Sequence, residues 1–173
     1  MPTGSLDPTF GTGGKVTTDF GTADDDFINE ITIDPDFRIL AGGTAQPGSA
    51  VFTIVRYNPN GTINVTHTED YIGSVFDSAV GLALAPNERI ILGGQVQPSG
   101  NETASTAVSC YDADANLDLN FGASGWVVTD TGSGFDGFSK VRLQSDDKIV
   151  AVGSSVQGDG RSYLVLARFI GCG

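Results

Sequence analysis

The feature that most constrains this chain is a pattern of thirteen residues that occurs three times. Its first copy, Ile31–Gly43, reads as a strand with alternating faces, a Pro/Asp turn, and a second apolar strand that ends in glycines. The pattern returns at Leu82–Gly94 and at Val141–Gly153. No helical periodicity of useful length accompanies it, so the repetition predicts an all-β repeat protein.

The segments around this pattern repeat as well. Leu6, Phe10 and Gly14 reappear as residues of the same types 111 positions later, which is two repeats of about 55 residues. Each copy accommodates four short strands, which is typical of β-propeller blades. We therefore predict a single domain, residues 1–173, with copies at approximately 4–60, 61–114 and 115–169.

Turn residues and β-branched runs mark the individual strands. In the second copy the first strand has drifted furthest from the pattern and is expected near Thr66–Ile72. The other expected strands are 15–20, 27–33, 38–42 and 51–57 in the first copy, those within 82–94 and up to Tyr111 in the second, and those within 141–153 and 163–169 in the third.

Three motifs in these copies resemble a known family. They are Leu-Asp-x-x-Phe-Gly-x-x-Gly-x-Val, a Pro-Asp-x-Arg/Lys-Ile turn, and Ala-Arg-Phe or Arg-Tyr-Asn. Together they resemble the delta-sixty-type repeats, bacterial β-propeller repeats classed as a domain of unknown function, over residues 4–169. The second copy departs from the family at Val65–Gly73 and has Cys110 where Arg56 and Arg168 stand. The resemblance implies an extracellular or cell-surface protein and supplies no catalytic residues.

Charge and composition restrict the partners. The formal net charge of −12 repels polyanions, so we expect no binding to nucleic acid or to anionic membrane surfaces. No apolar run reaches the ~18 residues of a membrane span, and no signal peptide is recognisable before the first repeat, although one could have been removed. Two cysteines are too few for a disulfide scaffold. Cys110 suits a small buried side chain, Cys172 could be free or bond to another chain, and the spacing leaves open whether they pair.

One acidic position and one basic position occur in every copy. Asp26, Asp77 and Asp136 could meet at a central axis and bind a cation, or each could accept backbone N–H groups beside its own innermost strand. We favour the second interpretation, because a position used three times suits a structural role. The repeated basic residues, which could pair with these acids, are Arg38, Arg89 and Lys148.

Two segments have a superficial likeness to ligand loops. Asp112–Asp118 has the alternating acids of a calcium loop, but Leu117 stands where glycine belongs and Ala123 where the bidentate glutamate belongs, so we favour a plain turn. Gly11–Lys15 lacks the leading glycine and the following helix of a phosphate loop. Its glycines are expected to supply positive φ angles in a turn.

Single residues add no recognisable site. His67 is the only histidine and is expected on an exposed strand edge. Trp126 could stack on a sugar, although such a residue more often fills a gap in sheet packing. We assign no catalytic, cofactor-binding or metal-ligating residues and no cofactor.

The residues favour a non-enzymatic β-propeller module with a binding or structural role. The alternatives are a carbohydrate-binding propeller and, less favoured, an enzyme with a site at the propeller axis that uses Asp or His67. Partners are then a further copy, a carbohydrate or another protein.

Three blades fall short of the four to eight that close a propeller. We therefore predict a homodimer with six blades, in which each chain lends Lys15–Phe20 to the last blade of the other; a fragment of a longer repeat protein is the alternative. Six repeated apolar residues are expected between blades: Ile31, Leu40, Leu82, Ile91, Val141 and Val150.

Overall fold

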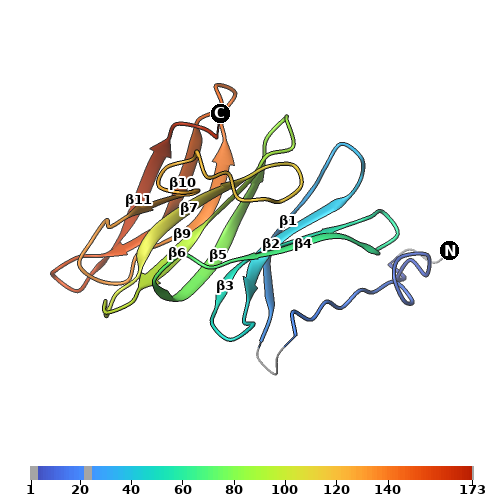
Figure 1. The fold of residues 1–173 in the computed structure, drawn as a ribbon, viewed down its shortest axis with the longest axis horizontal. Helices are drawn as coiled ribbons and strands as arrows, with labels where there is room; N and C mark the ends of the chain where they lie inside the picture. Colours follow the sequence, from blue (N-terminus) through green and yellow to red (C-terminus); the bar gives the residue numbers. More distant parts are fainter. Residues whose placement is uncertain (1–3, 22–24, 173) are drawn as a thin grey trace.

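The computed structural model describes residues 4–21 and 25–172, which form eleven strands in three antiparallel sheets and contain no helix (Figure 1). The absence of helix in the described residues confirms the all-β prediction. We call the sheets blades 1, 2 and 3. Blade 1 has the order β1 (Phe27–Ile33), β2 (Ile39–Ala45), β3 (Val51–Tyr57), β4 (Ile63–Glu69). Blade 2 has the order β5 (Ser74–Leu84), β6 (Ile90–Pro98), β7 (Ser105–Tyr111), β8 (Trp126–Thr129). Blade 3 has the order β9 (Gly137–Leu143), β10 (Ile149–Val156), β11 (Ser162–Phe169).

The same turn joins the first two strands of every blade. In blade 1 the Phe37 N–H donates to the Asp34 carbonyl and the Asp34 N–H donates to the Arg38 carbonyl, both at 3.0 Å. The third turn residue has a left-handed backbone in each blade, with φ of 61° at Phe37, 62° at Glu88 and 60° at Asp147. The repeated turn fixes the register of the two inner strands, because it sets which residues face one another.

The outer strand of a blade comes from the copy that follows it. β4 belongs to the second sequence copy but pairs with β3 in blade 1, and β8 belongs to the third copy but pairs with β7 in blade 2. The expected strand at Thr66–Ile72 is therefore present, but it begins and ends earlier, as β4. Blades 1 and 2 thus each take their edge strand from the next copy.

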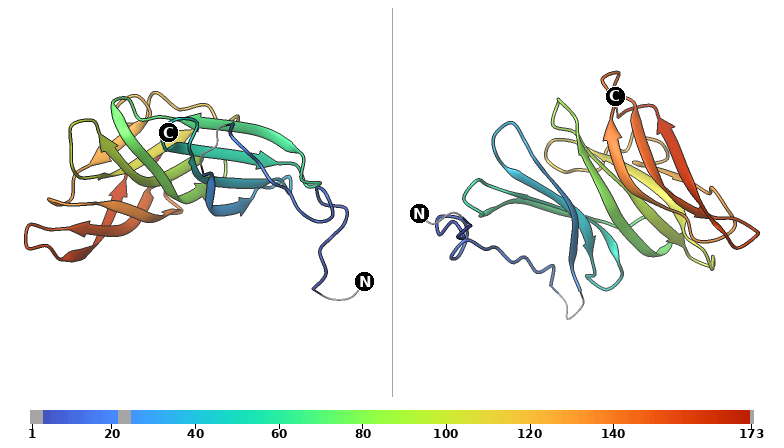
Figure 2. Two further views of the ribbon diagram at one scale, coloured as in Figure 1. Left: turned by 90° about the horizontal axis from the view of Figure 1, so that it is seen from below. Right: turned by 180° about the vertical axis from the view of Figure 1, so that it is seen from behind.

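Blade 3 departs from the prediction of equivalent four-stranded blades, because it has three strands and β11 forms its open edge. Within the single chain the expected strand at Lys15–Phe20 does not form: apart from a single bridge between Gly11 and Lys15, this segment pairs with no strand. A strand needs a neighbour to bond its backbone groups. Figures 1 and 2 place the N-terminal segment beside blade 1, at the end of the molecule opposite β11.

The three sheets stack side by side in chain order, and two apolar cores lie between them (Figure 2). Leu40, Leu82, Ile91 and Val141 are buried in these cores, as predicted. The core between blades 1 and 2 also includes Phe52, Ile54, Ile90, Leu92, Tyr111 and Trp126, and the core between blades 2 and 3 also includes Val108, Phe121, Phe138, Ile149 and Ala151.

The prediction of buried side chains is wrong at the two ends of the stack. Ile31 in blade 1 is 61% exposed, and Val150 in blade 3 is half-buried. These residues face away from blade 2, where the chain supplies no neighbouring blade.

A disulfide joins Cys110 of β7 to Cys172 near the C-terminus, with their Cα atoms 6.2 Å apart. The pairing that the sequence left open is therefore intramolecular, and it ties the tail after β11 to blade 2. Among the described residues, no helix has the length and hydropathy to span a bilayer.

Candidate functional site

The repeated aspartates hold the chain between blades. The Oδ2 atoms of Asp26, Asp77 and Asp136 accept N–H groups of Phe20, Tyr71 and Thr131 at 2.9, 2.7 and 2.8 Å. The acceptor interpretation is confirmed by these bonds. In the described part of the chain, no group of three or more acidic, His or Cys side chains is arranged to hold a metal.

Asp77 differs from its counterparts. Its Oδ1 is buried without a hydrogen-bond partner, whereas the corresponding oxygens accept the Gln46 N–H in blade 1 and the Val156 N–H in blade 3, each at 3.2 Å. In blade 2 the matching residue, Gln97, pairs with Phe76 in the ladder instead. Burial raises the pKa of Asp77 to about 7, because the charged carboxylate is poorly solvated there.

The repeated basic residues do not pair with these aspartates, which corrects that expectation. Arg38 contacts Asp34 at 2.6 Å and Glu88 at 2.8 Å, so it links the turns of blades 1 and 2. Arg89 pairs with Asp118, and Lys148 pairs with Asp146. The repeated aspartates are instead occupied with backbone N–H groups.

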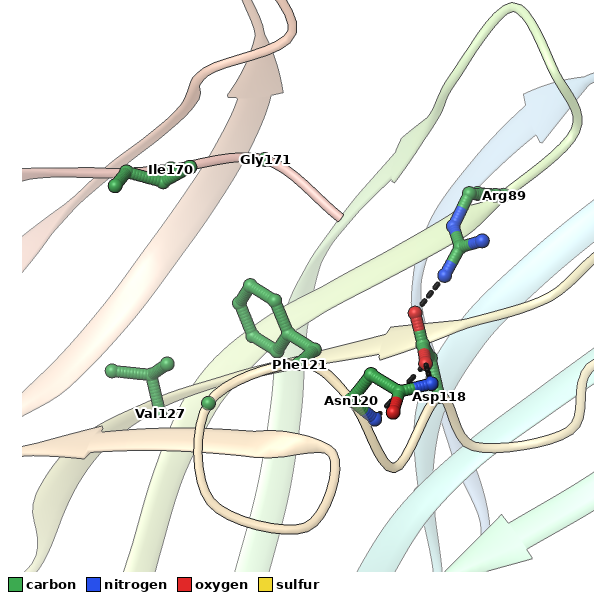
Figure 3. A pocket seen from close by; sticks show the side chains of 8 residues that line it. Arg89, Asp118, Asn120, Phe121, Val127, Ile170 and Gly171 are labelled. Atoms are coloured by element: carbon green, nitrogen blue, oxygen red, sulfur yellow. Dashed lines mark hydrogen bonds and ion pairs between the residues drawn. The ribbon is translucent and has the colours of Figure 1, made fainter. Parts of the chain in front are cut away.

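The Arg89–Asp118 pair borders a pocket of about 640 Å³ between blades 2 and 3 (Figure 3). Asn120 donates to Asp118 from its backbone N–H at 3.1 Å, and Phe121 and Val127 line the apolar wall. The guanidinium and the carboxylate neutralise one another, and no nucleophile lies beside them among the lining residues. The pair consequently ties the β7–β8 loop to the start of β6 within blade 2 more than it prepares a charged ligand site.

The two loop-like segments have structural roles. The Asp112 carboxylate accepts the N–H groups of Asp114 and Asn116, both at 2.9 Å, as expected of a plain turn. Gly11, Gly13 and Gly14 have φ angles of 55°, 60° and 84°, which confirms the turn interpretation of that segment.

Neither His67 nor Trp126 is free to serve as a ligand residue. His67 lies on the edge strand β4, as predicted, but it is partly buried and its Nε2 lies 2.8 Å from Glu69. Trp126 is buried and packs against Phe52 and Tyr71, with ring centroids 4.9 and 5.6 Å apart. The expectation that Trp126 could stack on a sugar is therefore wrong, and the packing alternative is confirmed.

The remaining candidate for a functional site is the pair of outer sheet faces, one on blade 1 and one on blade 3. On the outer face of blade 1, Ile28, Ile31 and Ile33 are 46%, 61% and 53% exposed. The ladder places three residues at the same positions in blade 2, namely Ala79, Leu82 and Leu84, and three in blade 3, namely Phe138, Val141 and Leu143. All six of these counterparts pack in the cores between blades.

The outer face of blade 3 shows the converse. Leu164 and Leu166 on β11 are 77% and 67% exposed. Their counterparts in β3 are Phe52 and Ile54, both fully buried against blade 2. Blade 1 thus exposes the face that, in blades 2 and 3, packs against the preceding blade. Blade 3 exposes the face that, in blades 1 and 2, packs against the following blade. We call these surfaces the blade 1 face and the blade 3 face.

Comparison with known proteins agrees with this architecture. The family model described as a domain of unknown function (DUF5122) beta-propeller matches residues 34–66 and 144–169. These matches cover β2, β3 and part of β4, and then β10 and β11. They support a β-propeller repeat family of unknown function, without identifying the delta-sixty type. No curated protein matches the chain significantly.

Sequence reasoning placed Ile31 and Val150 between blades because it assumed a closed ring. They belong to the first and last copies, so in the single chain Ile31 is exposed and Val150 is half-buried. Repetition predicts which face is apolar, but only the stack shows which copies lack a neighbour.

Proposed function

We propose that this chain is a non-enzymatic β-propeller module with a structural role, and that it acts by assembling with a second copy into a six-bladed ring. The observation that carries the proposal is the mismatch of burial at equivalent positions. Ile31 and Leu166 are exposed, whereas the residues that correspond to them in the inner blades are buried. Exposed apolar sheet faces of this kind mark interaction surfaces.

A second copy fits the two ends because they are the two halves of one interface. The chain already builds that interface twice, between blades 1 and 2 and between blades 2 and 3. In a two-fold ring the blade 3 face of each copy would meet the blade 1 face of the other. Closed symmetry of this kind buries both ends at once and leaves no growing filament.

We also infer an oxidising, extracytoplasmic location. The Cys110–Cys172 disulfide supports it, because such bonds persist mainly outside the cytosol.

Light scattering of the 173-residue chain tests the assembly. We expect a mass of about 36 kDa, twice the chain mass of 17.9 kDa. Leu166→Glu should return the protein to the chain mass, because it places a charge in the new core. Leu119→Glu is the matched control, because Leu119 is also 67% exposed but lies in the loop between β7 and β8 of blade 2. A stable 17.9 kDa species at micromolar concentration would refute the dimer.

A further inference from the structure

We propose that the two copies exchange strands, so that Lys15–Thr18 of each copy becomes the missing fourth strand on β11 of the other. This inference rests on the proposed ring and specifies how it closes. It assigns a binding function to the unpaired N-terminal segment and to the open edge of β11.

The N-terminal segment already has the position of a fourth strand relative to the blade that follows it. The Phe20 N–H donates to Asp26, as the Tyr71 and Thr131 N–H groups donate to Asp77 and Asp136 after β4 and β8. The hydroxyls of Thr18 and Tyr57 form a hydrogen bond of 2.6 Å. Segment 15–20 therefore adjoins blade 1 in the way that β4 adjoins blade 2 and β8 adjoins blade 3. Unlike β4 and β8, which are the fourth strands of blades 1 and 2, it belongs to no sheet in this chain.

Both complete blades predict one register for the exchange. In blade 1, Ile54 faces His67, and in blade 2, Val108 faces Val127. The corresponding pair is Leu166 of β11 with Val16 of the other copy. The neighbouring pairs are Lys15 with Ala167, Thr17 with Val165, and Thr18 with Leu164.

Charges at the two ends complement one another. Arg56 donates from Nε to Asn64 at 2.8 Å, and Arg89 pairs with Asp118. In blade 3, Arg168 stands at the position of Arg56 and Lys148 at that of Arg89. In the N-terminal segment, Asp7 stands at the position of Asn64 and Asp118. Asp7 is exposed, and Thr9 donates to its carboxylate at 2.9 and 2.7 Å, which lowers its pKa and keeps it charged.

A backbone bond should join the copies as well. The Asp77 N–H donates to the Ala50 carbonyl and the Asp136 N–H to the Ala104 carbonyl, both across blades and both at 2.9 Å. The equivalent bond would run from the Asp26 N–H to the Ser162 carbonyl of the other copy.

One position departs from the repeat. Gly42 and Gly93 let Leu92 and Val141 of the next blade approach closely, whereas the third counterpart is Val152. Val152 would face Ile31 of the other copy, so we expect the closing interface to be slightly wider there than the internal ones.

Site-directed cross-linking tests the register. A Lys15→Cys chain is mixed with an equal amount of an Ala167→Cys chain and oxidised with oxidised glutathione. The two side chains would face one another across the new strand pair, where Cβ atoms lie about 4.5–5.5 Å apart. The control mixes Lys15→Cys with Leu166→Cys, whose side chain is more exposed but points to the opposite face of the sheet.

We expect a covalent dimer of Lys15→Cys with Ala167→Cys, at least tenfold more abundant than in the control mixture. If light scattering shows a dimer but the two mixtures cross-link equally or not at all, the strand exchange is refuted and the ring survives. A monomer in light scattering would refute both.

Discussion

At the scale of single residues, the repeated positions are explained by contacts with the backbone. Asp26, Asp77 and Asp136 hold N–H groups of the incoming chain. Gly43, Gly94 and Gly153 leave room for a carbonyl group in the adjacent first strand, from Phe27, Ser78 and Gly137 respectively. These types recur because the backbone of every blade needs them.

Asp77 should make stability depend on pH. Its carboxyl group ionises near pH 4 in the unfolded chain but near pH 7 in the fold. Between these values the folded state holds more protons, so the contribution of Asp77 to the free energy of unfolding falls as the pH rises from about 4 to about 7.

Asp77→Asn removes this titration. We expect the stability of the variant relative to the natural protein to increase over the same pH range, as measured by urea denaturation. Asp136→Asn is the control at pH 8. It should destabilise, because both of its carboxylate oxygens accept backbone N–H groups and an amide offers only one acceptor. A constant difference between Asp77→Asn and the natural protein would contradict the assignment.

At the scale of the element, each blade has an irregular first strand. The β1–β2 ladder shifts register between Ile28 and Glu30, and the β5–β6 ladder shifts between Ala79 and Gly81. A β-bulge of this kind bends the strand and increases its twist. The glycine opposite each bulge, such as Gly94, is required because a Cβ atom would collide with the Ser78 carbonyl.

Gly94→Ala should therefore destabilise the protein by roughly 1–3 kcal/mol, as overpacking does, and lower Tm by several degrees. Gly158→Ala is the matched control, since its Cβ would meet only Ser133 at an ordinary 3.6 Å and its φ is not positive. Calorimetry of both variants checks the difference. Equal Tm values would show that the bulge does not need glycine.

Many of the strands and turns could be predicted from the sequence. β1 and β3 match the expected strands residue for residue, because alternation and turn residues are local signals. Lys15–Phe20 has the same local signal but joins no sheet within the single chain, because a local signal does not determine where a strand finds its partner. The pairing of Arg89 with Asp118 depends on how the loop before β8 folds back on blade 2, and that of Cys110 with Cys172 on how blades 2 and 3 stack, neither of which spacing encodes.

At the scale of the whole molecule, the stack has two different ends. The blade 1 face exposes isoleucines beside a donor segment, and the blade 3 face exposes leucines on an open edge. Open edges and bare apolar faces favour association, and natural proteins usually cover them. A second copy would cover both with contacts that the chain already makes internally.

Hydrogen exchange of the unmodified protein tests the central claim most directly. If Lys15–Thr18 pairs with β11 of a second copy, the inward-pointing amides of 15–18 and the outer-edge amides of 164–167 should exchange as slowly as those of β7 and β8. The protection should weaken on dilution as the dimer dissociates. Exchange of these amides as fast as in the loop at 99–103, at every concentration, would contradict it.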